Sequence, residues 1–545
     1  MSVSARALGG ALLAAAWLLA LAPARGVAAG AATRVATYRN PILYADYSDP
    51  DMLRVGKRYY LVASSFHFSP GLPLLESPDL VHWRIIGHVL PKLNFAPGYD
   101  MVGPFTLTDA TAGPVGPGQR YGGGVWAPSL RYHDQKFYVY WPTPDEGIFV
   151  STAPSMQGPW STPVAVIPGP GYEDPCPFWD SDGNAYLVHA KVGAGFLVLH
   201  RMSPDGMRVL DEGKTIVQDP VNLPVLEGPK LYKRHGWYYI FAPIGGVGSG
   251  GEAVLRARNI FGPYQWRQVL VPGQSGVKGP HQGGYVETPD HQGWFIHFNS
   301  TGAFGRITYL EPVRWQDDWP VIGDPIGDYK QGQPVLEHAL PVRVAGAEQY
   351  HLQDSDEFNG PTLGPQWEWN HNPDDARWSL TARPGYLRLQ AQGTQYLVTA
   401  RNTLTQILQG PSMTVSARLE IGHLVDQQRA GLVLFGVRPA WIGVVRDAGS
   451  SYLTYATAGV ETRGPALAGE AIDLKALVTP DQSVRFSYAA PDTAFQEFDP
   501  ATALARFSWW KGSRPGLFTY VKVTTATAVA APDGYVDIDW FHVEH

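Results

Sequence analysis

Three acidic residues in the first half of the chain stand at equivalent places before a proline. Asp49 and Asp174 directly precede Pro, and Glu227 is separated from Pro229 by a single glycine. Proline stiffens the turn that presents each carboxylate. One carboxyl group can give a proton to a leaving oxygen, another can activate water, and a third nearby charge can keep the donor protonated. Three such groups converging on one pocket suit glycosidic bond hydrolysis.

Two further acidic residues lie beside these three. Asp51 follows its proline and so falls outside the shared position, whereas Glu173 directly precedes Asp174. Adjacent residues of a strand point to opposite faces of the sheet. We therefore rank both below the three carboxylates and expect Glu173 to point away from the pocket.

A repeated pattern between residues 40 and about 330 must position the carboxylates. A turn containing Pro, Asp or Gly leads into a strand, a polar turn and a strongly aromatic strand, and five aromatic residues mark the copies: Tyr60, Tyr138, Tyr186, Tyr238 and Phe295. A period of about 50 residues is typical of a β-propeller with four strands per blade. The interval between Tyr60 and Tyr138 is longer than the others, which indicates an insertion around residues 92–120. Five copies predict five blades, with the three carboxylates before inner strands.

The repeat stops near residue 345, and strictly alternating segments follow. Apolar residues alternate with polar ones over 413–421, 484–488 and 536–540. This period of two predicts strands with one buried face, hence a β-sandwich. We expect an all-β chain with a propeller at 30–345 and a sandwich at 346–545, whose last strand ties down the C-terminus and which packs on the propeller.

The first residues have the pattern of a secretory signal. Arg6 precedes an apolar run over 7–22, and Val27-Ala28-Ala29 fits a cleavage site. The run is shorter than the roughly 20 residues of a membrane span. We expect residues 1–29 to be removed and the protein to be exported, to the periplasm or the medium, without a membrane anchor. The alternative is an uncleaved anchor.

Composition excludes several classes of protein. The net charge of −7 argues against a nucleic-acid partner, which would favour a basic excess. The one cysteine, Cys176, excludes an internal disulfide framework and a cysteine-type zinc site, and we expect it to be a small buried apolar residue. The glycine-rich run 246–251 matches a dinucleotide motif, but no helical pattern follows it. We interpret it as a loop.

The motifs together resemble glycoside hydrolase family 43. They are Ser48-Asp49-Pro50-Asp51, Val125-Trp126-Ala127-Pro128-Ser129, Glu173-Asp174-Pro175, Glu227-Gly228-Pro229 and His281-Gln282-Gly283-Gly284. The stretch from Asp356-Glu357-Phe358 to Asp539-Trp540-Phe541 resembles the concanavalin A-like C-terminal domain of β-xylosidase-type members. The resemblance implies a five-bladed propeller and inversion of the anomeric centre. It also implies Asp49 as general base, Glu227 as general acid, and Asp174 as the residue that modulates and orients the acid.

The resemblance implies further binding residues. His281 matches a histidine near the propeller axis that contacts a central water or, in some members, a calcium ion, and Arg306 matches an arginine that reaches the sugar. Trp126 and Phe66 are candidate walls for the apolar face of the sugar. The alternatives are a buried structural histidine for His281, a surface or blade-edge charge for Arg306, and core aromatics for Trp126 and Phe66. We expect that the protein requires no cofactor. A structural calcium ion near His281, bound through water, is left open. Around His281 the sequence has no carboxylate cluster that would form a dedicated calcium cage.

In some two-domain relatives the sandwich sends an aromatic side chain to the active-site rim. The corresponding stretch here, 511–515, has no aromatic residue, although Trp509 and Trp510 directly precede it. This composition argues against a rim role for the loop.

Three functions were compared. The favoured one is an exo-acting, inverting hydrolase that releases xylose or arabinose from xylan, arabinoxylan or arabinan oligosaccharides. A fructan-cleaving retaining enzyme of similar architecture would have Asn-Asp-Pro where this chain has Ser48-Asp49-Pro50, and Glu-Cys where it has Glu227-Gly228. A carbohydrate-binding protein without activity would not need all three carboxylates. The choice between the two pentoses and the oligomeric state stay open.

Overall fold

The computed structural model describes residues 36–101, 106–109, 113–115, 119–457, 459–498, 503–523 and 533–545. The signal segment expected at residues 1–29 lies outside the described residues. Within the described part of the chain, no helix is long and apolar enough to cross a membrane. Helical structure there is limited to five short 3₁₀ turns: η1 (Pro97–Asp100), η2 (Gly302–Phe304), η3 (Ala347–Gln349), η4 (Asp375–Arg377) and η5 (Leu397–Thr399).

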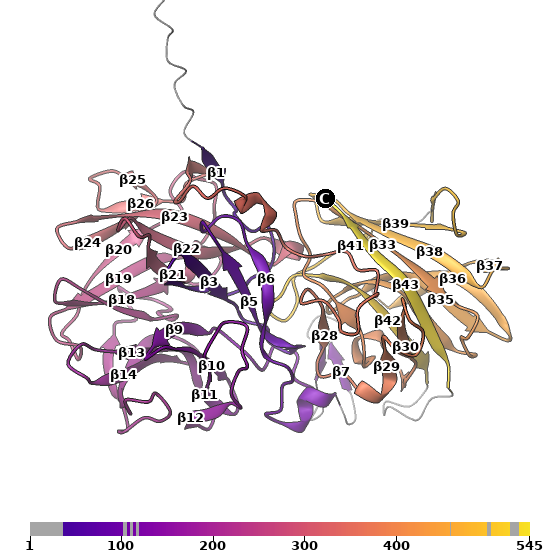
Figure 1. The fold of residues 1–545 in the computed structure, drawn as a ribbon, viewed down its shortest axis with the longest axis horizontal. Helices are drawn as coiled ribbons and strands as arrows, with labels where there is room; N and C mark the ends of the chain where they lie inside the picture. Colours follow the sequence, from indigo (N-terminus) through magenta and orange to yellow (C-terminus); the bar gives the residue numbers. More distant parts are fainter. Residues whose placement is uncertain are drawn as a thin grey trace, which may run out of the picture. The chain divides into compact units, whose positions relative to one another are not determined.

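Five antiparallel sheets form the predicted five-bladed propeller, drawn from indigo to pink in Figure 1. In each blade the first strand is innermost and contacts the first strands of neighbouring blades. The first two blades contain β2 (Asp51–Val55), β3 (Arg58–Val62), β5 (Gly71–Ser77) and β6 (Arg84–Leu90), then β9 (Ser129–His133), β10 (Lys136–Thr143), β11 (Gly147–Ala153) and β12 (Val164–Pro168). The third contains β13 (Tyr172–Trp179), β14 (Ala185–Lys191), β15 (Phe196–Met202) and β16 (Lys214–Gln218). The last two contain β17 (Lys230–Arg234), β18 (Trp237–Ile244), β19 (Gly251–Ala257) and β20 (Gln265–Leu270), then β21 (His281–Glu287), β22 (Gly293–Ser300), β23 (Arg306–Gln316) and β24 (Trp319–Ile322).

The aromatic residues that marked the repeat all lie in the second strand of a blade, in β3, β10, β14, β18 and β22. Apolar residues of neighbouring blades then pack together. Val188 and Leu199 of the third blade, for example, share one buried cluster with Ile240 and Leu255 of the fourth. A blade has two faces to bury, so this stacking between blades is what makes the repeat stable.

Short strands close and extend the propeller. β1 (Thr37–Arg39) pairs with β27 (Glu337–Ala339), which joins the start of the propeller to its end. β25 (Asp324–Ile326) and β26 (Gln331–Gln333) extend the fourth blade through one parallel pairing, Leu270 with Gly332. The predicted insertion between the first two blades holds η1 and the hairpin of β7 (Thr106–Asp109) and β8 (Gly113–Val115).

The C-terminal part of the chain forms two antiparallel-dominated sheets, orange to yellow in Figure 1, which make up the predicted β-sandwich. One sheet contains β28 (Glu368–Asn370), β31 (Gly393–Thr394), β32 (Leu404–Thr405), β34 (Gln428–Phe435), β35 (Ala440–Asp447), β36 (Ser450–Thr457), β37 (Val460–Leu467) and β42 (Arg514–Lys522). The other contains β29 (Trp378–Ser379), β30 (Leu387–Gln390), β33 (Met413–Glu420), β38 (Ala471–Val478), β39 (Ser483–Ala489), β40 (Gln496–Glu497), β41 (Ala503–Leu504) and β43 (Tyr535–Glu544).

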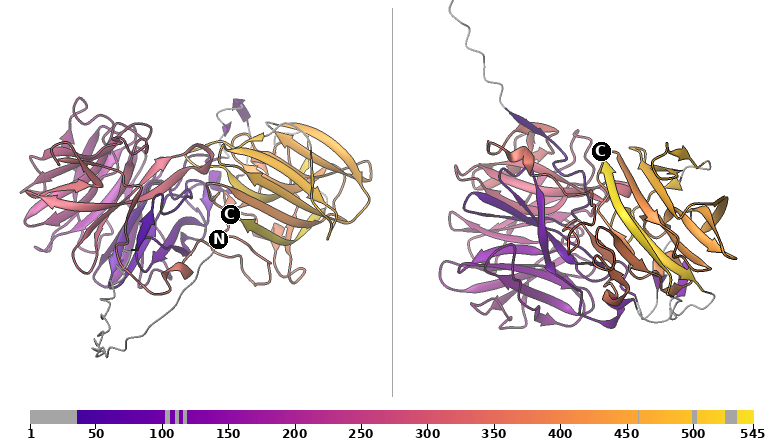
Figure 2. Two further views of the ribbon diagram at one scale, coloured as in Figure 1. Left: turned by 90° about the horizontal axis from the view of Figure 1, so that it is seen from above. Right: turned by 45° about the vertical axis from the view of Figure 1, so that its right-hand side comes forward.

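The final strand is integral to its sheet, as its alternation predicted. β43, yellow in Figure 2, lies between β30 and β33. Val536 and Ile538 are buried, but the alternation does not continue to Trp540. A register shift opposite Arg418 and Leu419 moves Phe541 into the core instead. The bulge therefore changes which face is buried near the C-terminus.

The sandwich packs directly on the propeller, and residues 37–545 form one compact unit. β4 (Phe68–Ser69) comes from the propeller segment yet pairs with β28 of the sandwich. The buried amide of Asn372 in the sandwich also accepts from the backbone N–H of Leu93 and donates to its carbonyl. These contacts agree with the expectation of docked domains.

Candidate active site

A cavity of about 430 Å³ lies where the inner strands of the propeller begin. Its described lining includes every residue proposed from the sequence for the site: Asp49, Phe66, Trp126, Asp174, Glu227, His281 and Arg306. Asp51, the lower-ranked neighbour, is instead fully buried and accepts hydrogen bonds from Arg131 Nη1 at 2.7 Å and the backbone N–H of Leu130 at 2.8 Å. The position before the inner strand therefore correctly predicted that Asp49, and not Asp51, lines the cavity.

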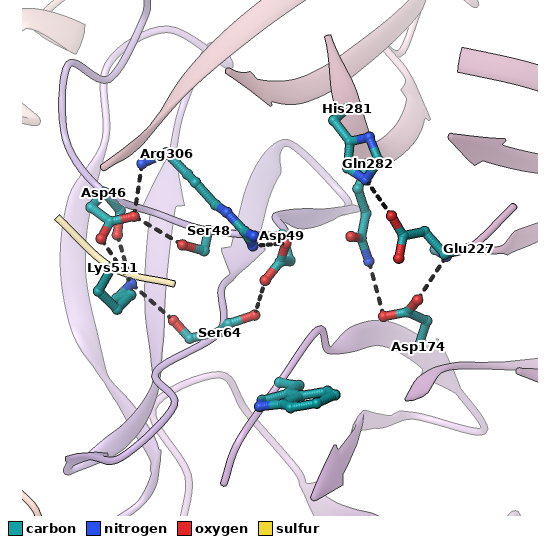
Figure 3. A network of polar contacts seen from close by, with 12 residues as sticks. Asp46, Ser48, Asp49, Ser64, Asp174, Glu227, His281, Gln282, Arg306 and Lys511 are labelled. Atoms are coloured by element: carbon teal, nitrogen blue, oxygen red, sulfur yellow. Dashed lines mark hydrogen bonds and ion pairs between the residues drawn. The ribbon is translucent and has the colours of Figure 1, made fainter. Parts of the chain in front are cut away.

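Asp49 is held by donors to both of its carboxylate oxygens. Arg306 Nη1, at the start of β23, donates to Oδ1 at 2.7 Å, and Ser64 Oγ donates to Oδ2 at 2.5 Å (Figure 3). Asp49 also has a left-handed backbone, with φ of 52°. This conformation is uncommon outside glycine, although aspartate tolerates it better than most residues. Donors to both oxygens fix the position of this carboxyl group.

Asp174 and Glu227 face Asp49 from the third and fourth blades. Asp174 Oδ2 accepts from the backbone N–H of Gly228 at 2.8 Å, which couples it to the turn carrying Glu227. Gln282 Nε2 donates to Asp174 Oδ1 at 3.3 Å, and Glu227 Oε1 lies 2.9 Å from His281 Nε2 (Figure 3). β21 therefore supports both carboxyl groups, through consecutive residues.

Glu173 also lines the cavity, and the expectation that it points away is wrong. Oxygens of Glu173, Asp174 and Glu227 lie within 4.8 Å of one another. The reason is a β-bulge between Glu173 and Cys176, where Asp174 has a φ of 56°. Simple alternation fails at a bulge because the extra residue changes the direction of its neighbours. In this position Glu173 accepts a hydrogen bond from the backbone N–H of Ala194 at 3.2 Å.

The crowding of these carboxyl groups changes their protonation. Burial raises the pKa of Asp174 well above its ordinary value, and the charge of Glu227 raises it further. Burial likewise raises the pKa of Glu173, with Asp174 as the next cause. Burial and like charge therefore disfavour ionisation of Asp174 and Glu173, so this pair retains a proton at pH values where an isolated carboxyl has lost it.

The sandwich supplies one aromatic wall of the cavity. Trp510 is half exposed and lines the cavity together with Phe66 and Trp126, and its ring centroid is 5.7 Å from the Arg306 guanidinium. This segment therefore does reach the active-site rim, contrary to the expectation from its composition, because the contributing residue precedes the 511–515 stretch. The tight turn between Ser508 and Lys511 directs it, and both of its central residues have positive φ. Such geometry is not visible in composition.

Loops of the third and fourth blades complete the cavity. Apolar and small residues line this part of the wall: Val192, Gly193, Ala194, Val225, Gly246 and Val247. Gly246 and Val247 belong to the glycine-rich run, which connects β18 and β19 as a loop. The run therefore forms part of the cavity wall. A dinucleotide-binding motif would instead be followed by a helix, and this run is followed by β19.

The surroundings of His281 were compared with the needs of calcium. Calcium takes six to eight oxygen ligands. The carboxylates that come close enough to hold an ion, among the described residues, are Glu173, Asp174 and Glu227, a set without His281. Buried His281 Nδ1 has no hydrogen-bond partner in the described part of the chain, so its chemistry fits contact with a water. A calcium ion at this histidine stays a prediction.

Two family models match the chain. Glycosyl hydrolases family 43 matches residues 38–320, and the beta xylosidase C-terminal concanavalin A-like domain matches residues 355–544. A putative beta-xylosidase of Xylanibacter ruminicola is 44% identical over 75% of this chain and 73% of its own length. A beta-xylosidase of Formosa agariphila is 33% identical over 93% of this chain and 90% of its own length.

Solved structures show the same architecture. A bifunctional GH43-CE protein of Bacteroides eggerthii aligns with a TM-score of 0.80 and 30% identity over 94% of this chain, which spans 64% of that protein. A GH43 glycoside hydrolase engineered to display endo-xylanase and exo-arabinofuranosidase activity aligns with a TM-score of 0.80 and 28% identity, over 93% of this chain and all of that one. With the matched models and the carboxylate-lined cavity, these likenesses show that the chain is an enzyme, a glycoside hydrolase acting on hemicellulose, and that it belongs to glycosyl hydrolases family 43.

Proposed function

We propose that this glycoside hydrolase is exo-acting and inverting, and that it releases xylose or arabinose from xylan, arabinoxylan or arabinan oligosaccharides. Asp49 is the general base, Glu227 the general acid, and Asp174 the residue that modulates and orients the acid. The observation that carries the proposal is the opposition, across one cavity, between Asp49 with its two donors and the crowded carboxyl groups around Glu227.

The proposed reaction is a single displacement. Asp49 accepts a proton from a water molecule as that water attacks the anomeric carbon on the face opposite the leaving group. Glu227 donates its proton to the glycosidic oxygen while the carbon–oxygen bond breaks, so the leaving group departs as a neutral alcohol. Asp174 contacts the turn of Glu227. Like charges on the two carboxyl groups repel each other, so Asp174 helps the acid to keep its proton until transfer occurs. The sugar is released with inverted configuration.

The exo-acting part of the proposal follows from the cavity walls. Residues of all five blades line the cavity, and Trp510 adds a wall from the sandwich. Phe66, Trp126 and Trp510 offer aromatic faces for sugar rings, while Arg306 supplies a cationic donor beside the base. A surrounded pocket of this kind suits the end of a sugar chain.

Both pentoses remain in the proposal, with xylose first. The two curated relatives described above are named beta-xylosidases, whereas a third, from Bacteroides ovatus, is named a non-reducing end alpha-L-arabinofuranosidase and is 32% identical. The greater identity of the first, at 44%, supports β-xyloside cleavage as the main activity. Ring size and stereochemistry of the substrate would be selected by the loops at 192–194 and 246–247.

The test compares aryl β-xyloside with aryl α-arabinofuranoside, using wild type and Glu227→Gln. We expect release of sugar from at least one substrate by the wild type, and proton NMR of the first-formed sugar should show the anomer opposite to that of the substrate. The retained anomer would instead support a covalent intermediate and the fructan-type mechanism. Absence of release from both substrates and from arabinoxylan oligosaccharides would refute the proposed specificity.

We also propose that the protein acts after export and needs no cofactor. The pattern of residues 1–29 supports cleavage and delivery to the periplasm or the medium, and N-terminal sequencing of the secreted protein would test it. Two carboxyl groups and water suffice for the reaction. Full activity after exhaustive dialysis against a chelator, with metal analysis of the dialysed protein, is the expected outcome; calcium retained in stoichiometric amount would support the ion near His281.

A further inference from the structure

A buried lysine of the sandwich reaches the base side of the active site. Lys511 is only 2% exposed. Its Nζ donates to the backbone carbonyls of Asp46 at 3.0 Å and Ser64 at 3.2 Å, both in the propeller, and lies 3.5 Å from Asp46 Oδ2 (Figure 3). Ser64 is the residue whose hydroxyl donates to Asp49. The ammonium group therefore fixes the backbone that presents one donor of the base.

The carboxylate of Asp46 links the same lysine to the other donor. Asp46 Oδ1 accepts from the backbone N–H of Arg306 at 3.0 Å and from Ser48 Oγ at 2.9 Å. Its Oδ2 accepts from the backbone N–H of Gly512 at 2.7 Å, directly after Lys511. Asp46 thus lies between the sandwich and the residue whose guanidinium binds Asp49.

Two chains of contacts run from Lys511 to the same carboxylate, one through Ser64 and one through Asp46 and Arg306. We propose that Lys511 is a positioning residue for the base, so that the sandwich completes the catalytic machinery of the propeller by holding Asp49 in place. The inference rests on the proposed function, because it takes Asp49 as the base. The described lining of the cavity includes Trp510 but not Lys511, so the lysine acts through its neighbours.

The charge balance explains why a cation belongs here. Arg306 and Lys511 are the cations near Asp49, while Asp46 lies behind it and Glu173, Asp174 and Glu227 face it from across the cavity. Burial lowers the pKa of Lys511, and Asp46 offsets this effect. Arg514 of the sandwich lowers this pKa further, whereas Glu368 and Asp49 raise it. Three oxygen atoms face the ammonium group, which supplies the partners that a buried charge requires. Removal of this cation would leave Asp46 and Asp49 with Arg306 as their shared positive neighbour.

The turn that delivers Lys511 is held in an unfavourable backbone conformation. Ser508 and Lys511 exchange two backbone hydrogen bonds, and the residues between them, Trp509 and Trp510, have φ of 51° and 67°. Two-residue turns of this type favour asparagine and glycine. Trp509 is anchored against Tyr121, with ring centroids 4.1 Å apart. Strain that packing maintains in this way is typical of functional positions.

The experiment measures kcat and KM against pH for full-length Lys511→Met and Asp46→Asn. Lys511→Met should lower kcat about 10–100-fold, since small displacements of catalytic groups have effects of this size. It should also move the acid limb of the kcat/KM profile to higher pH, because the ionised base loses a neighbouring cation. Asp46→Asn should move the same limb to lower pH, because it removes a negative charge and leaves both cations. Opposite shifts are a readout that simple loss of structure would not produce.

Two variants across the same interface serve as controls. Lys92→Met removes a lysine that pairs with Asp375 of the sandwich, and Asn372→Ala removes the buried amide that binds Leu93. Both should leave the acid limb unchanged, and the second should lower the melting temperature. If Lys511→Met loses activity only in proportion to its folded fraction, or if its acid limb coincides with that of wild type, the inference is wrong.

Failure of the inference remains distinct from failure of the proposed function. If Asp49→Asn retained activity, Asp49 would not be the base and the proposed function itself would fail. If Asp49→Asn is inactive while Lys511→Met and Asp46→Asn keep the wild-type acid limb, only the positioning role is refuted. Should Lys511→Met fail to fold, the direction of the Asp46→Asn shift decides: an unchanged or upward acid limb contradicts the inference.

Discussion

The two sides of the active-site cavity use the same residue types in opposite surroundings. On one side Asp49 receives Arg306 and Ser64, with Lys511 behind them. On the other side, oxygens of three carboxyl groups lie within 4.8 Å of one another. A carboxylate among cations and donors loses its proton readily, whereas crowded buried carboxyl groups retain one. The difference teaches that neighbours, rather than residue type, distinguish the two sides, as the proposed roles of base and acid require.

The two sides also differ in how the chain builds them. The base side combines the first blade, the fifth blade and a turn of the sandwich. The acid side is made by consecutive blades, with Asp174 bound to the N–H of Gly228 and both supported from β21. The position of the proposed base therefore depends on domain docking, while that of the proposed acid depends on the packing of adjacent blades.

Replacing the base should have the largest effect. Asp49→Asn keeps the size of the side chain but removes the group that accepts the proton from water, so kcat should fall about 10²–10⁴-fold. The loss should be similar for substrates with good and poor leaving groups, since both need the attacking water. Steady-state kinetics on a series of aryl glycosides checks this, with circular dichroism to confirm folding. Hydrolysis near the wild-type rate would mean that this side is not the base.

Glu227→Gln should show a different dependence on the leaving group. With an unactivated alcohol leaving group the loss should approach about 10²–10⁴-fold, because the glycosidic oxygen no longer receives a proton. With a strongly acidic phenol the loss should be much smaller, since that group departs without protonation. A comparison of dinitrophenyl and methyl glycosides measures this. Equal losses on both would contradict the acid assignment and remove the contrast between the two sides.

Asp174→Asn should act mainly through pH. Burial raises the pKa of Asp174 first and the charge of Glu227 raises it second, so the two carboxyl groups repel each other when both are ionised. Without the negative charge of Asp174 the acid loses its proton more readily, so the alkaline limb of kcat/KM should move to lower pH, with kcat at the optimum about tenfold lower or less. The acid limb serves as an internal control and should move less. An alkaline limb displaced to higher pH would contradict this electrostatic role.

The sequence was sufficient for the fold and for the main site residues. Aromatic residues in the second strand of each blade indicated the five-blade period, because these strands must pack between blades. Asp49, Asp174 and Glu227 were found because turns before the inner strands all open on one cavity. These features repeat along the chain, so their regular spacing in the sequence is enough to locate them.

The remaining site residues depend on local irregularity or on contacts distant in sequence. Glu173 reaches the cavity through a bulge, a backbone change that no side-chain pattern records. Lys511 contacts Asp46 across more than four hundred residues, and Trp510 depends on a turn that its sequence disfavours. No alternation or repeat relates these positions, so only the packed domains bring them together.

Glu173→Gln should have the smallest effect, and it tests the crowding of the acid side through stability. The pKa of Glu173 is raised in the folded state by burial first and by Asp174 second, so the folded protein binds a proton that the unfolded chain has released. The stability linked to this proton is complete below the ordinary glutamate pKa and declines as pH rises through the folded value. Glutamine stays neutral and can still accept from the backbone N–H of Ala194. Wild type and variant should therefore melt alike near pH 4, and the variant should become the more stable of the two, by about 1–3 °C, as pH rises toward 9. Melting curves by calorimetry at several pH values measure the difference, with Asp46→Asn as a variant that removes a carboxyl group from the other side. A stability difference that stays constant with pH would show that Glu173 is not crowded in solution, and the contrast between the two sides would then rest on Asp174 and Glu227 alone.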